Sequence, residues 1–377
     1  MSATRCLFAV AAVALAVGGG WAGPAADPAV DRPWGVAPFA GEGVAGFRDG
    51  PREAARFNWP TAVAVTPDWS VYVADFGNHR IRRVDPGGRV TTLAGSGADG
   101  FADGTGPAAA FSGPNGLALG PDGALYVADA GNARIRRVAL DGAVTTVAGD
   151  GVRGVRDGPA ARARFVYPTG LAFDRKGLLY VVDRWANNVR VVTPEGVVGT
   201  LAGDGTPALR DGPGPVARFN NPLAAVWDTH WGLVVADSGN HALRRVGPDA
   251  VVTTLAGGPE PGTMDGPADV AAFAWNTGLV GDGEGGFFVS DAHNHRIRHM
   301  SHGRDVSTVA GTGVAGERDG PAEVASFRFI TGIARDLAGN LLVADSGAHR
   351  IRRVVRGDAQ VVRAGPGIAV AAPLADD

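Results

Sequence analysis

A period of 54 residues runs through the chain and constrains its fold more than any other feature of the sequence. The period separates Phe57 from Phe111 and Gly95 from Gly149, and it continues through six copies of each. It carries six aspartates, which are Asp75, Asp129, Asp183, Asp237, Asp291 and Asp345. It also carries six arginines, which are Arg82, Arg136, Arg190, Arg244, Arg298 and Arg352. Self-similarity at one spacing indicates an array of equivalent structural units.

Each period contains four short segments that are apolar or β-branched, at 61–65, 71–74, 80–84 and 90–94 in the first copy. Such segments, bounded by turn residues such as Gly77-Asn78, are typical of β-strands. Four-stranded units at a fixed period are the signature of a β-propeller. The sequence therefore predicts an all-β fold, a six-bladed β-propeller with four antiparallel strands per blade.

About 20 residues separate each fourth strand from the next first strand. In the first of these loops, Asp49 is placed to cap a helix and Pro51 suits a first helical turn. We therefore expect long loops with a short helical turn between blades, and Phe57 and its equivalents packed beneath them. Two segments compete for the outermost position of the last blade, because 36–41 and 360–365 both resemble a fourth strand.

The N-terminus has the features of a secretory signal peptide. Arg5 precedes an apolar stretch at 6–17, and small residues flank Trp21. We predict a signal peptide at 1–22, a linker at 23–35, the propeller at 36–365 and a disordered tail at 366–377. Cys6, the single cysteine, lies within the signal peptide, so no disulfide is expected. The mature chain is expected to be secreted, extracellular or periplasmic, without membrane insertion.

The repeat resembles a known family. Residues 125–135 read Leu-Tyr-Val-Ala-Asp-Ala-Gly-Asn-Ala-Arg-Ile, and residues 78–81 read Asn-His-Arg-Ile. Both segments look like the NHL repeat. Residues 90–95 with Asp103-Gly104 resemble its long-repeat subtype, which occurs in teneurins and in bacterial and plant extracytoplasmic proteins. The resemblance implies a six-bladed propeller, and its members serve in protein binding, nucleic-acid binding, sensing and occasionally catalysis.

Departures from the repeat indicate where recognition occurs. The position two residues after each repeated phenylalanine precedes the innermost strand, and it reads Trp59, Gly113, Tyr167, Asn221, Trp275 and Phe329. Aromatic side chains around one channel mouth can stack on a sugar ring or hold a peptide. The alternative is that they only pack between loops. The polar residues predicted to orient a ligand are Thr61, Asn115, Thr169, Thr277, Thr331 and Arg328.

The third repeat diverges most. Where the others read Gly-Asn-His-Arg or similar residues, it reads Trp185-Ala186-Asn187-Asn188, preceded by Arg184. An exposed tryptophan beside an arginine is typical of an interface hot spot, so both residues are candidates for ligand binding. The other interpretation is a turn that has drifted in sequence.

The repeated aspartates and arginines are predicted to have a structural role, with each arginine paired to an aspartate. His293 and His295 are the candidates for a metal site, but no third ligand is directed at them. We therefore expect no metal and no cofactor. Metal-dependent sugar lactonases and peptide-amidating lyases share related folds, which leaves an enzyme as the alternative. The inner strands carry no glutamate, and the aspartates that follow them are simpler to interpret as turn residues.

These features favour a binding module over an enzyme. A formal charge of −3 together with export argues against a nucleic-acid partner. We expect a monomer that recognises a protein, peptide or glycan through its long-loop face.

Overall fold

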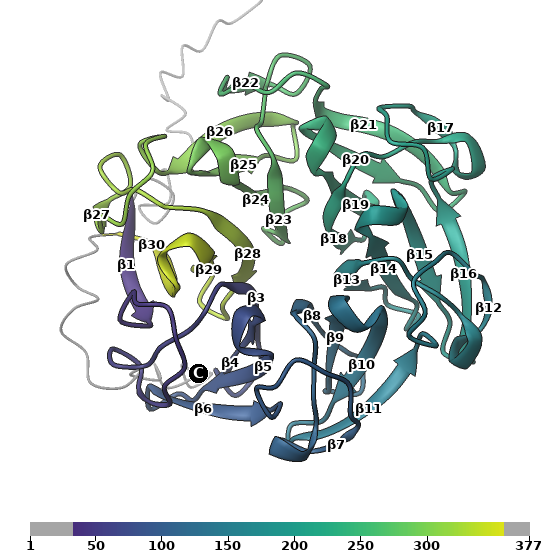
Figure 1. The fold of residues 1–377 in the computed structure, drawn as a ribbon. Coiled ribbons are helices and arrows are strands. Elements are labelled where there is room, and N and C mark those ends of the chain that lie inside the picture. The colour runs from purple at the N-terminus through teal and green to yellow at the C-terminus, as the bar shows by residue number, and fades with distance from the viewer. Residues whose placement is uncertain (1–32, 358–377) are drawn as a thin grey trace, which may run out of the picture. The chain divides into compact units, whose positions relative to one another are not determined.

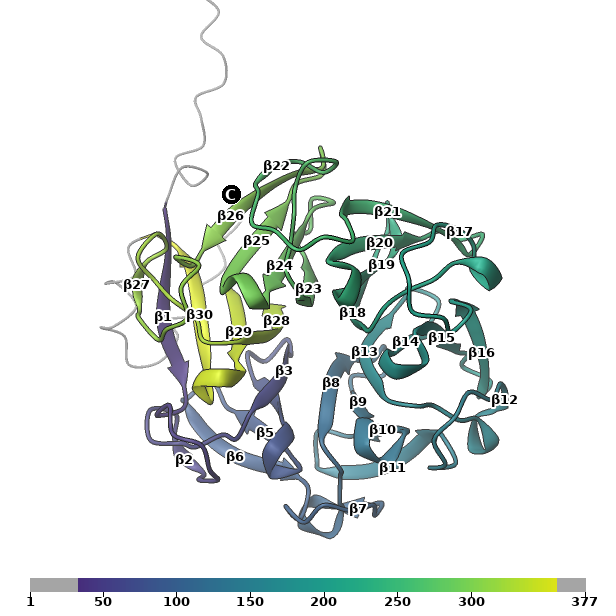
Figure 2. The same cartoon turned by 45° about the horizontal axis from the view of Figure 1, so that its top comes forward.

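The computed structural model describes residues 33–357. Six antiparallel sheets surround a central axis as the blades of a propeller (Figures 1 and 2). The innermost strands are β3 (Pro60–Val65), β8 (Pro114–Leu119), β13 (Pro168–Phe173), β18 (Pro222–Asp228), β23 (Asn276–Gly281) and β28 (Ile330–Arg335). We number the blades 1 to 6 in this order. The predicted all-β six-bladed fold is confirmed.

The second and third strands of each blade form a hairpin. The second strands are β4 (Val71–Asp75), β9 (Leu125–Asp129), β14 (Leu179–Asp183), β19 (Gly232–Asp237), β24 (Phe287–Asp291) and β29 (Leu341–Asp345). The third strands are β5 (Arg80–Val84), β10 (Arg134–Val138), β15 (Asn188–Val192), β20 (Ala242–Val246), β25 (Arg296–Met300) and β30 (Arg350–Arg356). The turns between them are the 3-10 helices η1 (Phe76–Asn78), η3 (Ala130–Asn132), η5 (Arg184–Ala186), η7 (Ser238–Asn240), η8 (Ala292–Asn294) and η9 (Ser346–Ala348).

The fourth strands lie outermost among the long strands. In blades 1 to 5 they are β6 (Arg89–Ala94), β11 (Ala143–Ala148), β16 (Val197–Ala202), β21 (Val251–Gly257) and β26 (Asp305–Ala310). In blade 6 this position belongs to the N-terminal strand β1 (Trp34–Ala40), which pairs with β30 in antiparallel register. The purple β1 lies beside the yellow β30 in both views. The N-terminal segment thus closes the ring, while the competing segment 360–365 lies outside the described residues, as do 1–22 and 366–377.

Each sheet also has a fifth strand, so the prediction of four strands per blade is wrong by one. The fifth strands contain two residues each and are β2 (Gly50–Pro51), β7 (Gly104–Thr105), β12 (Gly158–Pro159), β17 (Gly212–Pro213), β22 (Gly266–Pro267) and β27 (Gly320–Pro321). The Gly-Pro segment that was expected to begin a helical turn also pairs with the outer strand of the same sheet, as Gly50 does with Val90.

The expected turn follows the fifth strand in each long loop, and in blade 1 the backbone N–H groups of Ala54 and Ala55 both donate to the carbonyl of Pro51 at 2.9 Å. Three long loops contain a 3-10 helix, namely η2 (Gly106–Ala108), η4 (Ala160–Arg162) and η6 (Gly214–Val216). The predicted capping role of Asp49 is wrong. One carboxylate oxygen of Asp49 accepts a hydrogen bond from Arg82 at 2.5 Å, and the other accepts the backbone N–H of Thr92 at 3.1 Å. Because Asp49 pairs with Arg82 of the same blade, its carboxylate does not cap a helix in the loop.

Apolar clusters lie between neighbouring blades. One contains Ala74 and Ile81 of blade 1 with Phe111 and Val127 of blade 2. Phe57 and Leu342 belong to a cluster that joins blade 1 to blade 6. The repeated phenylalanines are inaccessible to solvent, and burying one such side chain stabilises the fold by roughly 1.5–3 kcal/mol. Because each cluster needs two blades, the blades support one another around the ring.

A buried polar node repeats in every blade. In blade 1 the Nη1 atom of Arg82 lies 2.6 Å from Oδ2 of Asp75, and neither side chain is accessible to solvent. The same guanidinium donates to Asp49 and to the backbone carbonyls of Arg48 and Arg56. Burial raises the pKa of Asp75, and the positive charge of Arg82 opposes that rise. The node ties the long loop to the second and third strands of its blade.

Candidate functional site

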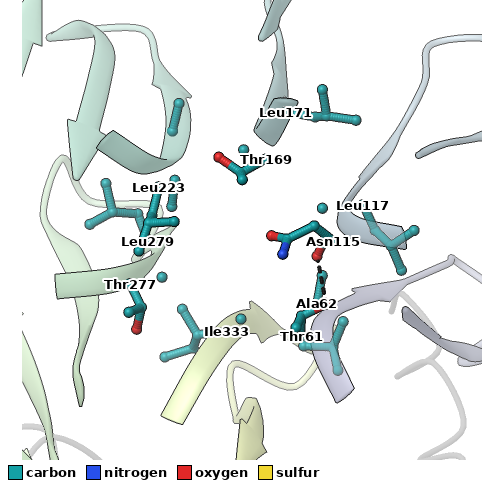
Figure 3. Close-up of a pocket in the computed structure, with 17 residues that line it drawn as sticks. Thr61, Ala62, Asn115, Leu117, Thr169, Leu171, Leu223, Thr277, Leu279 and Ile333 are labelled. Carbon is teal, nitrogen blue, oxygen red and sulfur yellow. Dashed lines mark hydrogen bonds between the residues drawn. The ribbon is translucent and has the colours of Figure 1, made fainter. Parts of the chain in front are cut away.

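The innermost strands surround a narrow central channel with a cavity of about 110 Å³ (Figure 3). Its wall combines apolar side chains such as Leu117, Leu279 and Ile333 with the polar Thr61 and Asn115. Sites that enclose a drug-sized ligand usually measure about 300–1,000 Å³. The channel is therefore too small to enclose such a ligand, and a larger ligand would contact its mouth.

The threonines predicted to orient a ligand are used within the ring. The hydroxyl of Thr61 donates to the backbone carbonyl of Asn115 in the next blade at 2.8 Å, and that of Thr277 donates to the carbonyl of Ile330 at 2.9 Å. Thr331 contacts the hydroxyl of Ser346 at 2.5 Å. The first two contacts connect adjacent inner strands, and the third lies within blade 6. By contrast, no hydrogen bond to the side-chain amide of Asn115 occurs within residues 33–357, and this amide points into the channel (Figure 3).

The residues before the inner strands lie at the channel mouth, and hydrogen bonds between blades fix their backbone. The backbone N–H of Trp59 donates to Nδ1 of His349 in blade 6 at 3.1 Å, and that of Trp275 donates to Nδ1 of His241 in blade 4 at 3.0 Å. Both tryptophans have left-handed backbones, with φ of +53° and +59°. Sequence reasoning missed this role of the repeated histidines, because the partners lie in different blades.

Four rings from three adjacent blades form what we call the aromatic arc. The ring centroids of Trp59 and Phe329 are 5.8 Å apart with an interplanar angle of 27°. Phe329 lies 5.8 Å from the ring of His293, which stacks on Trp275 at 5.6 Å and 11°. The structure thus brings together three of the four predicted aromatics. His293 joins them, although the sequence indicated it only as a metal candidate.

The fourth predicted aromatic belongs to a separate cluster on blade 3. Tyr167 stacks on Trp185 with ring centroids 4.1 Å apart, and Trp185 remains 49% exposed. The Cζ atom of Arg153 lies 5.6 Å from the Tyr167 ring and 5.3 Å from the Trp185 ring. Arg184 connects the two groups of rings, because its Cζ atom lies 5.9 Å from the Trp275 ring. We call Tyr167, Trp185, Arg153 and Arg184 the blade 3 cluster.

The remaining candidates occupy other environments. Arg328 forms an ion pair with Glu317 at 3.4 Å, so its charge is already paired. His295 lies at the end of η8 with φ of +52°. Within residues 33–357, no group of three or more histidine, cysteine, aspartate or glutamate side chains is arranged to hold a metal ion. In the same range no helix has the length and apolar character needed to cross a bilayer.

The aspartates after the inner strands organise turns on the opposite face. Asp174 accepts the backbone N–H groups of Lys176 and Leu178 at 2.8 and 2.9 Å. Asp282 accepts those of Glu284 and Gly286 and contacts Nε2 of His299 at 2.8 Å. These contacts are typical of Asx turns.

Comparison with known sequences identifies the repeat. The NHL repeat profile matches residues 57–84 and 111–138. NHL repeat-containing protein 2 from Bos taurus is 31% identical over 292 residues, which cover 67% of this chain and 40% of that protein. The chain therefore spans about two fifths of the length of this curated relative.

Comparison with solved structures matches the whole ring. A protein of unknown function from Bacteroides thetaiotaomicron VPI-5482 superposes with a TM-score of 0.67 at 19% identity, covering 86% of this chain and 76% of that chain. An auxiliary nutrient binding protein from Bacteroides ovatus ATCC 8483 gives a TM-score of 0.66 at 15% identity, with 86% and 77% covered. At these identities the likeness concerns the fold.

Six sheets closed by β1 define the class of the molecule as a six-bladed β-propeller. The repeat profile and the sequence relative identify it further. The chain is an NHL-repeat propeller.

Proposed function

We propose that this propeller is a binding protein that recognises a protein, peptide or glycan at the channel mouth on its long-loop face. The observation that carries the proposal is the aromatic arc, in which rings from blades 1, 5 and 6 lie in one connected series. Trp59 remains 38% exposed within it. Aromatic rings supply a large apolar contact area, and partly exposed rings beside a polar cavity are common in ligand sites.

Two further observations support this proposal and an extracytoplasmic location. One structural neighbour with the same fold is an auxiliary nutrient binding protein. Residues 1–17 have the charge and apolar pattern of an export signal. In this proposal the ring acts outside the cytoplasm, and no catalytic step is assigned to it.

The proposal is tested by a ligand screen followed by substitution in the arc. The full chain is screened on arrays of glycans and peptides, and the dissociation constant of each hit is measured by calorimetry. The double variant Trp59→Ala, Trp275→Ala is expected to weaken binding at least ~100-fold, because two stacking side chains contribute roughly 1–3 kcal/mol each. Its circular dichroism and melting temperature should stay close to those of the parent.

A matched control is Trp69→Ala. Trp69 has a similar left-handed backbone, with φ of +64°, but it lies in the turn between β3 and β4 on the opposite face. This variant should bind each hit as the parent does. Full affinity in the double variant, or equal loss in the control, would refute the site.

A further inference from the structure

Arg184 occupies a repeat position whose side chain points toward the channel mouth. It is the first residue of η5, and the equivalent residues are Phe76, Ala130, Ser238, Ala292 and Ser346. Ser238 donates to the carbonyl of Asn276, the first residue of the inner strand in the next blade, at 2.5 Å. Ser346 donates to the carbonyl of Pro60 in the same way. A side chain at this position is therefore directed at the start of the neighbouring inner strand.

Arginine is much longer than the serine or alanine found at this position in four blades. The Cζ atom of Arg184, in blade 3, lies 5.9 Å from the ring of Trp275 in blade 5. Blade 4 lies between them in the ring. Because both residues are at the inner end of their blades, this contact places the guanidinium at the channel mouth.

The charge of Arg184 has no carboxylate partner among residues 33–357, and its one charge-related contact there is with the face of the Trp275 ring. No carboxylate lies within 4 Å of it there, and its Nε atom is buried without a hydrogen bond. Other arginines with a buried Nε, such as Arg350 and Arg353, donate through their terminal nitrogens to Glu317 and Asp336. Arg184 is half-buried, and this burial lowers the pKa of its guanidinium. A desolvated, unpaired cation is costly, and an anion would offset that cost.

The backbone around the mouth offers little to a peptide. All six N–H groups at the position before the inner strands are already bonded, four to a histidine Nδ1 or asparagine Oδ1 of the preceding blade and two to a repeated aspartate. Hydrogen-bond donors for a ligand at the mouth must therefore come from side chains. Those present are aromatic faces, the free amide of Asn115, and the guanidinium groups of Arg153 and Arg184.

We propose that the channel mouth binds an acidic saccharide, with the carboxylate of a uronate residue paired to Arg184 and sugar rings packed against the aromatic arc and the blade 3 cluster. This inference rests on the proposed function and specifies its ligand class. Arg184 supplies a planar pair of donors that matches a carboxylate. The aromatic faces supply packing for the C–H faces of the sugar, and Asn115 supplies both a donor and an acceptor for hydroxyl groups.

The test compares one acidic oligosaccharide with its neutral counterpart. Tetragalacturonate and its carboxyl-reduced form are titrated into the full chain at constant ionic strength, by calorimetry and by tryptophan fluorescence. The acidic form is expected to bind at least ~10-fold more tightly, because its carboxylate accepts charge-assisted hydrogen bonds from Arg184. Trp275→Phe should remove most of the fluorescence change, because Arg184 lies against that ring.

Arg184→Leu should abolish the preference for the acidic form while leaving the melting temperature within a few degrees of the parent. Arg184→Lys should retain part of it. The matched control is Arg137→Leu, since Arg137 pairs with Asp122 near the opposite face and should not affect binding.

Several outcomes would overturn the inference. Equal affinity for the two sugars, no affinity for either, or acid preference that survives Arg184→Leu would each do so. A peptide whose free C-terminal carboxylate binds through Arg184, where tetragalacturonate does not, would refute a saccharide ligand. If a neutral hit binds through Trp59 and Trp275 independently of Arg184, the proposed function stands and this inference falls. If neither set of residues affects any hit, both fail.

Discussion

The buried node of blade 1 predicts a large effect for one substitution. Arg82→Met removes the guanidinium that pairs with Asp75 at 2.6 Å and leaves that carboxylate buried without its cation. It also removes the donor to the carbonyls of Arg48 and Arg56. Breaking a buried ion pair from one side costs about 3–5 kcal/mol. This is a substantial part of the ~5–15 kcal/mol by which domains are usually stable.

The equivalent arginine of blade 3 provides a comparison for the free-energy loss expected in Arg82→Met. Arg190 lies 3.9 Å from Asp183, and this carboxylate accepts the backbone N–H groups of Val166 and Tyr167 instead. Arg190→Met should therefore cost less than Arg82→Met, because Asp183 loses only a contact at 3.9 Å, whereas Asp75 loses a direct hydrogen bond at 2.6 Å. Both carboxylates keep two other donors, which for Asp75 are the backbone N–H of Asn58 and the side-chain amide of Asn78. Urea unfolding followed by tryptophan fluorescence measures both differences, and hydrogen exchange in each blade shows whether the loss is local.

The pH dependence of the unfolding free energy tests independently whether the unpaired Asp75 causes the loss in Arg82→Met. Burial already raises the pKa of Asp75, and the positive charge of Arg82 opposes that rise. In Arg82→Met the pKa should rise further. A group whose pKa is raised by folding stabilises the folded state at low pH, and this contribution is lost as the pH rises through the folded pKa. The loss in Arg82→Met should hence be smaller at pH 5 than at pH 7. Three results would contradict this reasoning. They are a loss of unfolding free energy below ~1 kcal/mol in Arg82→Met, a larger loss in Arg190→Met, and a loss in Arg82→Met that is the same at pH 5 and pH 7.

Two other predictions concern contacts between blades. Burial lowers the pKa of His241 and His349, so the stability they contribute is present above their unfolded pKa near 6.5 and is lost as the pH falls through the lower folded value. Replacing both with asparagine should flatten the fall in melting temperature between pH 7 and pH 5, and an unchanged slope would exclude these histidines as its source. In Gly116→Ala the new Cβ would lie 1.8 Å from the carbonyl oxygen of Thr169, whereas Gly281→Ala meets nothing within 4 Å. We expect Gly116→Ala to melt many degrees lower than the parent and Gly281→Ala to melt at the same temperature as the parent. Calorimetry measures both melting temperatures, and equal values for the two variants would contradict this prediction.

The sequence period was sufficient to predict the ring and most strand positions. The segment expected at 80–84 is β5 itself, and the other three strands of blade 1 begin or end within one residue of expectation. These positions follow from local pattern, since a strand needs only alternating burial and flanking turns. The fifth strands were missed because residues such as Gly50 and Pro51 favour turns and rarely form strands.

The candidate site was less predictable from the sequence. Four aromatics were placed at the mouth from their phase in the repeat, but the separation of Tyr167 from the other three depends on side-chain directions that the period does not encode. The contact between Trp59 and His349 spans 290 positions in the chain. Only closure of the ring by β1 makes such a pair adjacent. His293 gave one usable signal, because it replaces the glycine that occupies its repeat position in four of the blades, as Gly77 does in blade 1.

The distinction between repeated and irregular positions has a physical basis in this ring. Repeated groups satisfy each other, as the arginine nodes and the six bonded N–H groups at the mouth illustrate. A group that every blade uses internally has little remaining capacity to bond a ligand. No other blade has an arginine at the position of Arg184, and its guanidinium has no carboxylate partner among the described residues. A partly desolvated cation without a counter-ion raises the free energy of the folded state, and binding of an anion offsets that increase. The same reasoning makes Arg184 a sharper test of ligand class than any aromatic residue, because an aromatic ring can pack on acidic and neutral ligands alike, whereas a guanidinium without a carboxylate partner favours an anion.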